Sequence, residues 1–207
     1  MIPTRPMAPA RRKLLDAALS LIREQGYNAT TIDQLCARAG VAKGSFFHHF
    51  ADKPALAVAA AEHWATTTGA LFAHAPYHAP ADPLDRLLAY IDFRKALIAG
   101  ALPEFTCLVG TMAQEVYQTQ AAIRDACAAS ITSHAATLEA DIAAAIALYG
   151  VNGGFTPQSL ALHTQAVLQG AFIVAKATGE AAVAVESVDH LRRYVELLFS
   201  ARKGEAA

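Results

Sequence analysis

Residues 41–53, with the sequence VAKGSFFHHFADK, gather side chains that bind anions or metals. Lys43 and Lys53 carry positive charge, and His48 and His49 offer imidazole nitrogens. Adjacent histidines fall on different faces of a helix, whereas a metal site uses i,i+4 spacing or further ligands. We therefore predict no metal site here. Whether the two lysines form a solvated charged face or a surface for a polyanion depends on the elements that position them.

Charge is unevenly placed along the 207 residues. The first 53 residues carry eight Lys and Arg against four Asp and Glu, a balance of +4, whereas residues 54–207 carry nine against fourteen, a balance of −5. A basic segment joined to an acidic one indicates a polyanionic partner for the basic segment alone. The chain is 54% hydrophobic, which excludes a disordered chain and allows a sizeable core.

A second set of chemically capable residues lies further along the chain. Cys107 is predicted just inside a helix start, where a thiol can acquire a lowered pKa and become nucleophilic. With Cys107, His134 and Asp141 could be nominated as a nucleophile, a base and the residue that orients the base, although sequence spacing does not bring them together. The sequence contains no glycine-rich phosphate loop, GxSxG elbow or HExxH motif. We predict neither enzymatic activity nor a cofactor.

The segment before residue 54 predicts three short helices. In RRKLLDAALSLIREQ the apolar residues recur at helical spacing until Gly26, which supplies a left-handed stop. Thr31 begins a capping-box pattern for a second helix that ends at the turn of Gly40. A third helix is predicted at 43–50. This order is the layout of a helix-turn-helix, whose third helix enters the major groove of DNA.

The rest of the chain predicts longer helices and no strand. Asp52 is expected to cap the first of them, with Pro54 in its first turn. The predicted ranges are 53–74, 83–100, 104–118, 120–149, 157–179 and 185–202. We predict an all-α protein with a helix-turn-helix domain at 1–53 and a helical ligand-binding and dimerisation domain at 54–207. No apolar run reaches membrane-spanning length and no signal peptide is recognised, so a cytoplasmic protein is expected.

The stretch TTIDQLCARAGVAKGSFFHHFADKPAL resembles the DNA-binding head of TetR/AcrR-type transcriptional regulators. In that family a Gly-Val turn leads into a Lys-Gly-Ser/Thr recognition helix that ends in an aromatic run. The resemblance implies a double-stranded DNA operator, contacted by position through Thr31, Lys43, Gly44, Ser45, Phe47, His48 and Lys53. Phe46 and Phe50 are expected to face inward. Two departures weaken single contacts: Ala42 replaces a capping Ser or Thr, and Phe47 replaces a phosphate-binding Tyr.

The family plan also implies a small-molecule effector bound by the helical body. The candidate lining residues are His63, Trp64, Phe93, Cys107, Met112, His134, Phe172 and Lys176. Cys107 and Lys176 are similar in placement to a subgroup that includes the N-ethylmaleimide reductase repressor, where such a pair responds to electrophiles or oxidants. Covalent sensing at Cys107 and an inert thiol both stay open, whereas Cys36 and Cys127 are predicted to be packing residues.

The two C-terminal helices, predicted at 157–179 and 185–202, are expected to pair with their copies in a homodimer. The residues expected to support this are the small Ala166, Gly170 and Ala177 and the apolar row of Val188, Leu191, Val195 and Leu198. The alternative is that both helices cover the chain's own core. The predicted function is a dimeric repressor released from a palindromic operator by an apolar or electrophilic effector. An activator would follow the same physics.

Overall fold

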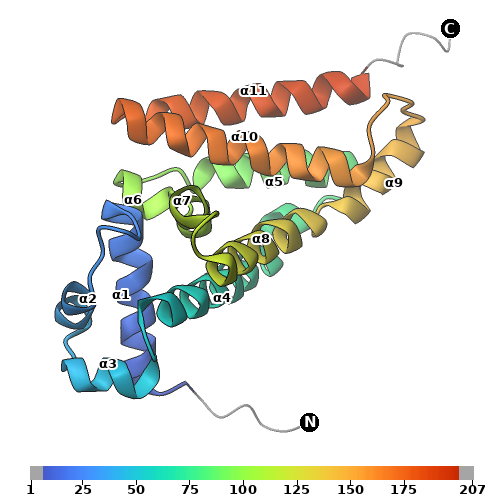
Figure 1. The fold of residues 1–207 in the computed structure, drawn as a ribbon. Helices are drawn as coiled ribbons and strands as arrows, with labels where there is room; N and C mark the ends of the chain where they lie inside the picture. The colour runs from blue at the N-terminus through green and yellow to red at the C-terminus, as the bar shows by residue number, and fades with distance from the viewer. Residues whose placement is uncertain (1–6, 201–207) are drawn as a thin grey trace, which may run out of the picture. The chain divides into compact units, whose positions relative to one another are not determined.

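The structure, a computed structural model, describes residues 7–200, and within that range it contains helices and no strand (Figure 1). The elements are α1 (Pro9–Gln25), α2 (Ile32–Ala39), α3 (Lys43–His49), α4 (Lys53–Ala73), the 3-10 helix η1 (Pro76–His78), α5 (Pro83–Ala96), α6 (Leu102–Phe105), α7 (Leu108–Val116), α8 (Ala121–Ala136), α9 (Glu139–Tyr149), α10 (Pro157–Thr178) and α11 (Ala181–Ser200). The predicted all-α class is confirmed. Among the described residues, no helix is both long enough and apolar enough to cross a membrane.

The helices group into two compact units. One consists of the described part of residues 1–67 together with 107–130, and the other consists of 68–106 together with the described part of 131–207. The first unit holds α1 to α3, α7 and most of α4 and α8, and the second holds α5, α6 and α9 to α11. The predicted domain division after residue 53 stays a prediction.

The three N-terminal helices form where the sequence predicts them. Gly26 ends α1 at φ +90° and donates its N–H to the carbonyl of Ile22 at 2.9 Å. At the start of α2, Thr31 Oγ1 accepts from Gln34 N at 3.2 Å, and Gln34 Oε1 accepts from Thr31 N at 2.8 Å. This reciprocal capping box satisfies two N–H groups that the first turn leaves without partners. Gly40 then ends α2 in the left-handed conformation, at φ +63° and ψ +42°.

The short helix α3 is held by its aromatic side chains rather than by a cap. Phe46 and Phe50 are 0% and 4% exposed and face the core, as predicted, with ring centroids 5.7 Å apart. Ala42 stands at the N-cap and makes no side-chain bond to the first turn. The next helix is capped as expected, because Asp52 Oδ1 accepts from Ala55 N at 2.7 Å.

Two predicted helices are each split in the structure. The range 104–118 was wrong, because Thr106 takes an extended backbone at ψ +157° and separates α6 from α7. The range 120–149 was also wrong, because the chain turns at Thr137 between α8 and α9. Thr137 Oγ1 donates to the carbonyl of His134 at 2.7 Å, so the side chain competes with the helical backbone bond there.

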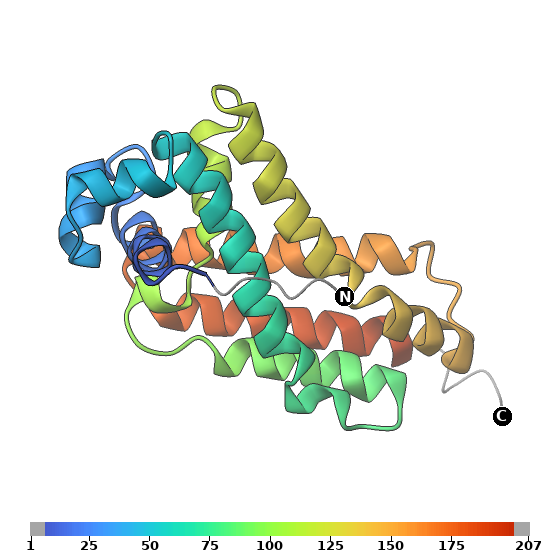
Figure 2. The same ribbon diagram turned by 90° about the horizontal axis from the view of Figure 1, so that it is seen from below.

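The C-terminal helices pair antiparallel, turning back on each other through Gly179, and Figure 2 shows them side by side. The predicted start at residue 185 was late, since α11 begins at Ala181, and residues 201–202 of that range lie outside the described part of the chain. Val188, Leu191 and Val195 are buried at 1%, 2% and 0% exposure. These three residues of the predicted row therefore belong to the chain's own core, which was the alternative considered for the row, whereas its fourth residue, Leu198, is half-buried.

Candidate nucleic-acid interface and effector residues

Four of the seven predicted DNA contacts lie on one exposed face of α3. Lys43, Gly44, Phe47 and His48 are all exposed, and they fall on a single arc of the helix. The side chain of Phe47 is 52% exposed, while its ring edge packs against the buried Phe46 with centroids 5.2 Å apart. The opposite face of α3 is thus anchored in the core, and its outer face carries one cation, one imidazole and one apolar ring.

The space around the first turn of α3 differs between Gly44 and Ser45. A Cβ added at Gly44 would meet no atom of residues 7–200 within 4 Å, so no contact in this part of the chain requires glycine there. Ser45 is half-buried, and its N–H donates to the carbonyl of Ala42 at 2.9 Å. The outer part of the α3 first turn is therefore sterically open to an external partner.

Lys43 is paired, but only at the surface. Its Nζ lies 2.8 Å from Asp33 Oδ1, with side-chain exposures of 58% and 74% for the two residues. The hydrogen bond from Lys43 to Asp33 raises the pKa of the lysine, so it stays charged at neutral pH. Exposed pairs of this kind are weak, because water screens them and both side chains lose freedom in making them. A phosphate can therefore compete for this ammonium.

The ammonium of Lys53, a predicted DNA contact, is bound within the chain. Its Nζ donates to the carbonyl oxygens of Tyr27 at 3.1 Å and Thr30 at 2.9 Å, and approaches that of Asn28 at 3.5 Å. The ammonium also lies 4.3 Å from the centroid of the Tyr27 ring. Burial lowers its pKa. Its three donors thus face the turn that leads into exposed Thr31, and its phosphate contact stays a prediction.

Glu115 of α7 binds the same turn, a contact that was not predicted from the sequence. The carboxylate of Glu115 accepts from Tyr27 N at 3.0 Å and from Asn28 N at 2.7 Å. With Lys53 on its carbonyls and Glu115 on its N–H groups, the α1–α2 turn has its polar backbone bound from two sides. No local signal marks this contact, because 88 residues separate the partners.

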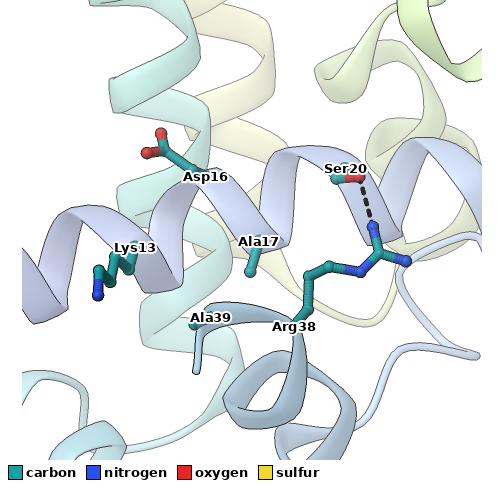
Figure 3. A pocket seen from close by; sticks show the side chains of 6 residues that line it. All are labelled: Lys13, Asp16, Ala17, Ser20, Arg38 and Ala39. Atoms are coloured by element: carbon teal, nitrogen blue, oxygen red, sulfur yellow. Dashed lines mark hydrogen bonds between the residues drawn. The ribbon is translucent and has the colours of Figure 1, made fainter. Parts of the chain in front are cut away.

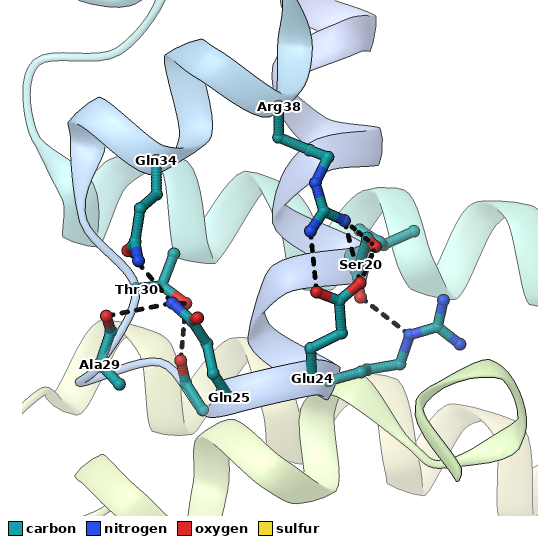
Figure 4. A network of polar contacts seen from close by, with 10 residues as sticks. Ser20, Glu24, Gln25, Ala29, Thr30, Gln34 and Arg38 are labelled. Carbon is teal, nitrogen blue, oxygen red and sulfur yellow. Dashed lines mark hydrogen bonds and ion pairs between the residues drawn. The ribbon is translucent and has the colours of Figure 1, made fainter. Parts of the chain in front are cut away.

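The packing of α2 on α1 is completed by a polar network, shown in Figure 4. Arg38 donates to both carboxylate oxygens of Glu24 at 2.9 Å and to Ser20 Oγ at 2.8 Å. The hydrogen bonds from Arg38 and Ser20 lower the pKa of Glu24 to about 2. Nearby, Gln25 Nε2 donates to Ala29 O at 3.1 Å and to Gln34 Oε1 at 3.1 Å, which ties the capping box to α1.

A shallow hollow of about 400 Å³ lies beside this network, between α1 and α2 (Figure 3). It is lined by Lys13, Asp16, Ala17, Ser20, Arg38 and Ala39. None of the predicted effector residues lines it. The hollow is a feature of the helix-turn-helix rather than of the predicted effector region.

Several effector candidates lie in the first unit. Trp64 lies under the guanidinium of Arg23, 5.2 Å from its ring centroid, and His63 Nε2 is 3.2 Å from Asp16 Oδ1. Met112 is fully buried in α7. These contacts stabilise the unit, and the assignment of these residues to effector binding stays a prediction.

The three cysteines differ in accessibility. Cys107 is half-buried and caps α7, where its Sγ lies 3.5 Å from Gly110 N. Cys36 and Cys127 are buried, as predicted for packing residues. Burial and the nearby Cys107 raise the pKa of Cys127 to about 12, and burial raises that of Cys36. Cys107 is therefore the thiol that α7 presents at its N-terminus.

The other candidates lie in the second unit. Phe93 and His134 both pack against Phe72, whose ring centroid is 5.5 Å from that of Phe93 and 4.5 Å from that of His134. Phe172 packs against Phe105 at 5.9 Å, and Lys176 is exposed on the last turns of α10. Among the described residues, no three His, Cys, Asp or Glu side chains are grouped to hold a metal ion.

Comparison with known proteins places both parts of the chain. The family described as bacterial regulatory proteins of the tetR family matches residues 14–60, and the tetracycline repressor-like C-terminal domain matches residues 83–191. The transcriptional regulator AcuR of Cereibacter sphaeroides is 31% identical over 107 residues, which are 52% of this chain and 49% of AcuR. The regulator BetI of Cronobacter sakazakii is 50% identical over 46 residues, 22% of this chain and 23% of BetI. The matched segments thus span about half or less of these curated relatives.

Solved structures show the same fold over nearly the whole chain. A TetR regulatory protein from Rhodobacter sphaeroides superposes with a TM-score of 0.79 at 24% identity, over 90% of this chain and 99% of that one. Reduced NemR of Escherichia coli superposes with a TM-score of 0.77 at 22% identity, over 90% and 96%. Because the C-terminal family alone matches more than half of the residues and the N-terminal family matches the helix-turn-helix, the chain belongs to the TetR family of bacterial regulatory proteins.

Proposed function

We propose that the chain is a dimeric repressor that binds a palindromic DNA operator through α3 and is released by a small effector. The observation that carries this proposal is the exposed face of α3, where Lys43, Gly44, Phe47 and His48 lie together over a buried aromatic anchor. A recognition helix needs this arrangement, because side chains that reach base edges and phosphates must project from a helix that is itself rigidly held.

The open space at Gly44 supports close approach of this face to DNA. Glycine is unfavourable in a helix relative to alanine, and no atom of the described residues lies within 4 Å of a Cβ at this position to require it. A phosphate or base edge that approaches the first turn of α3 closely would explain why this position carries no side chain. Thr31 adds a hydroxyl and the first N–H groups of α2, where an anion is favoured.

The outward side of α10 and α11 supports a homodimer. On α10, Leu162 and Ile173 are 41% and 44% exposed, and on α11 Tyr194 and Leu197 are 43% and 69% exposed. Ala166 and Ala177 are exposed on α10 as well, and a Cβ added at Gly170 would meet nothing within 4 Å. Small and apolar residues on one face let a second copy approach closely and bury the exposed area.

In this proposal, effector release acts through the spacing of the two heads of the dimer. Two α3 helices of a dimer read successive major grooves only when they stand about 34–36 Å apart. An effector that binds better to a dimer with another spacing shifts the population away from the DNA-binding form by its differential affinity. A repressor is favoured over an activator by the family's tetracycline repressor-like body.

The test is binding of the purified protein to the DNA upstream of its own gene, measured by fluorescence anisotropy and footprinting. We expect protection of two half-sites about one helical turn apart and a two-chain species in sedimentation. Lys43→Ala should weaken binding, whereas the matched control Arg124→Ala, which removes an exposed cation from α8, should not. Absence of any specific site, or a monomer at micromolar concentration, would refute the corresponding part of the proposal.

A further inference from the structure

A buried polar cluster occupies the second unit, where α5, α8 and α10 contribute one group or more each. Tyr90 Oη lies 2.9 Å from His134 Nε2 and accepts from Gln165 Nε2 at 3.1 Å. Arg94 Nη1 lies 3.3 Å from both Tyr90 Oη and His134 Nε2. Tyr90 and Gln165 are 0% and 4% exposed, so the cluster is closed on that side.

Arg94 brings a charge that no carboxylate within residues 7–200 neutralises. The other cations of α5 each have one: Arg86 holds Asp141 at 2.7 Å and Lys95 holds Asp189 at 2.7 Å. Arg94 is half-buried, and its hydrogen bonds among the described residues go to the hydroxyl and the imidazole, both through Nη1. Its Nε and Nη2 donors therefore have no acceptor among the described residues, and they form the edge of a guanidinium that binds a carboxylate bidentately.

His134 does not neutralise the charge of Arg94, because its ring carries no negative charge. A guanidinium can only donate, so the imidazole nitrogen facing Arg94 acts as an acceptor and the ring is neutral. Burial and the charge of Arg94 lower the pKa of His134 to about 4, in agreement with a neutral ring. The cluster thus carries one net positive charge, and Nε and Nη2 of the half-buried Arg94 are open to an anion from outside the described residues.

The walls around the guanidinium are aromatic. Arg94 lies 5.2 Å from the centroid of Phe72 and 6.0 Å from that of Tyr90. Tyr77 packs edge-on against Tyr90 at 5.3 Å and lies 5.8 Å from Phe93. The rings of Phe72 and Tyr90 lie within cation–π distance of the guanidinium and offer apolar surface beside it. A ligand that suits both features has one anionic group and an apolar body.

We propose that Arg94, Tyr90 and His134 form the effector subsite of this regulator and that it takes the carboxylate of a small apolar monocarboxylic acid. This inference rests on the proposed function. The Nε–Nη2 edge of Arg94 holds the two carboxylate oxygens, and the rings of Phe72 and Phe93 contact the apolar body. Tyr90 and His134 are positioning residues, because they hold the guanidinium through Nη1.

The test is calorimetric titration of the free protein, without DNA, with benzoate and straight-chain carboxylates from butanoate to octanoate. Benzamide serves as the neutral isostere of benzoate. The variants are Arg94→Gln and Arg94→Lys, with Lys95→Gln as matched control, because it removes an equal charge from the next residue of α5. Thermal melts of all variants verify folding.

We expect at least one carboxylate of the series to bind the wild type, benzamide to bind at least tenfold more weakly than benzoate, and Arg94→Gln to lose at least tenfold in carboxylate affinity. Arg94→Lys should retain part of it, and Lys95→Gln should stay within twofold. Arg94→Gln should melt no lower than the wild type, since it removes an unbalanced charge; a clear drop would mark a structural cation instead.

The proposal is overturned if no carboxylate of the series binds the wild type at ligand concentrations on the order of 10 mM. It is also overturned if folded Arg94→Gln binds the carboxylates as tightly as the wild type. Operator binding by the ligand-free protein is measured separately and does not depend on Arg94. Loss of the subsite therefore leaves the regulator intact, whereas absence of operator binding with an intact carboxylate site overturns only the proposed function.

Discussion

Replacement of Glu115 by alanine should destabilise the N-terminal unit more than its half-exposed position suggests. The carboxylate accepts two backbone hydrogen bonds, from Tyr27 N at 3.0 Å and Asn28 N at 2.7 Å. Alanine leaves both N–H groups without this acceptor, in a turn whose carbonyls are already bound by Lys53. The turn precedes α2 and sets its position, so the loss should reach the DNA-binding face as well.

The size of the effect follows from the bonds that are lost. Hydrogen bonds to a charged group contribute roughly 1.5–3 kcal/mol each. The bond to Asn28 is exposed and water replaces part of it, whereas the bond to Tyr27 is partly buried. We expect a loss of about 2–4 kcal/mol for Glu115→Ala. Glu115→Gln keeps one acceptor oxygen and should lose about half of that.

The assay is urea unfolding followed by circular dichroism at neutral pH, with operator affinity measured on the same samples. Glu62→Ala is the matched control, because Glu62 is an exposed helix glutamate in the same unit. It should change the unfolding free energy by less than about 0.5 kcal/mol. If Glu115→Ala lowers the unfolding free energy by no more than Glu62→Ala does, the Glu115 contacts do not hold the turn and the reasoning is wrong.

Three further predictions concern charge and thiol chemistry. Lys43→Ala should reduce the slope of log affinity against log salt by about 0.9, one phosphate contact, in anisotropy titrations; an unchanged slope would remove Lys43 from the interface. Glu24 has a pKa of about 2, below its ordinary 4.5, so its contribution to stability is present above pH 4.5 and is lost as pH falls toward 2. Chemical denaturation across this window should show the wild type losing stability relative to Glu24→Gln, and parallel curves would contradict the pairing. N-ethylmaleimide should modify the half-buried Cys107 before the buried Cys127, as mass spectrometry of the labelled protein would check. Cys107→Ser should abolish the fast labelling, and equal labelling rates at both thiols would show that burial does not control access.

The local features of the N-terminal helices could be predicted because their causes are close in sequence. The capping box of Thr31, the left-handed Gly40 and the inward Phe46 and Phe50 depend on residues within one or two turns. The outward residues of α3 were expected from the resemblance to the TetR/AcrR head, and their helical spacing agrees with it. The breaks at Thr106 and Thr137 were missed, because the apolar pattern continues on both sides and a hydroxyl or an extended residue decides where the helix stops.

What the sequence by itself determined was the all-helical class and the helix-turn-helix, since both follow from spacing along the chain, whereas the residues expected on the outer face of α3 came from the resemblance to the TetR/AcrR head. Only the tertiary structure decided that Lys53 and Glu115 bind one turn from opposite sides. It also decided that Val188, Leu191 and Val195 of α11 are core, and that, among the described residues, Arg94 stands without a carboxylate while Arg86 and Lys95 have one. The physical reason is the same in each case: a side chain's partner is set by packing between segments distant in sequence, and no local periodicity records which partner that is.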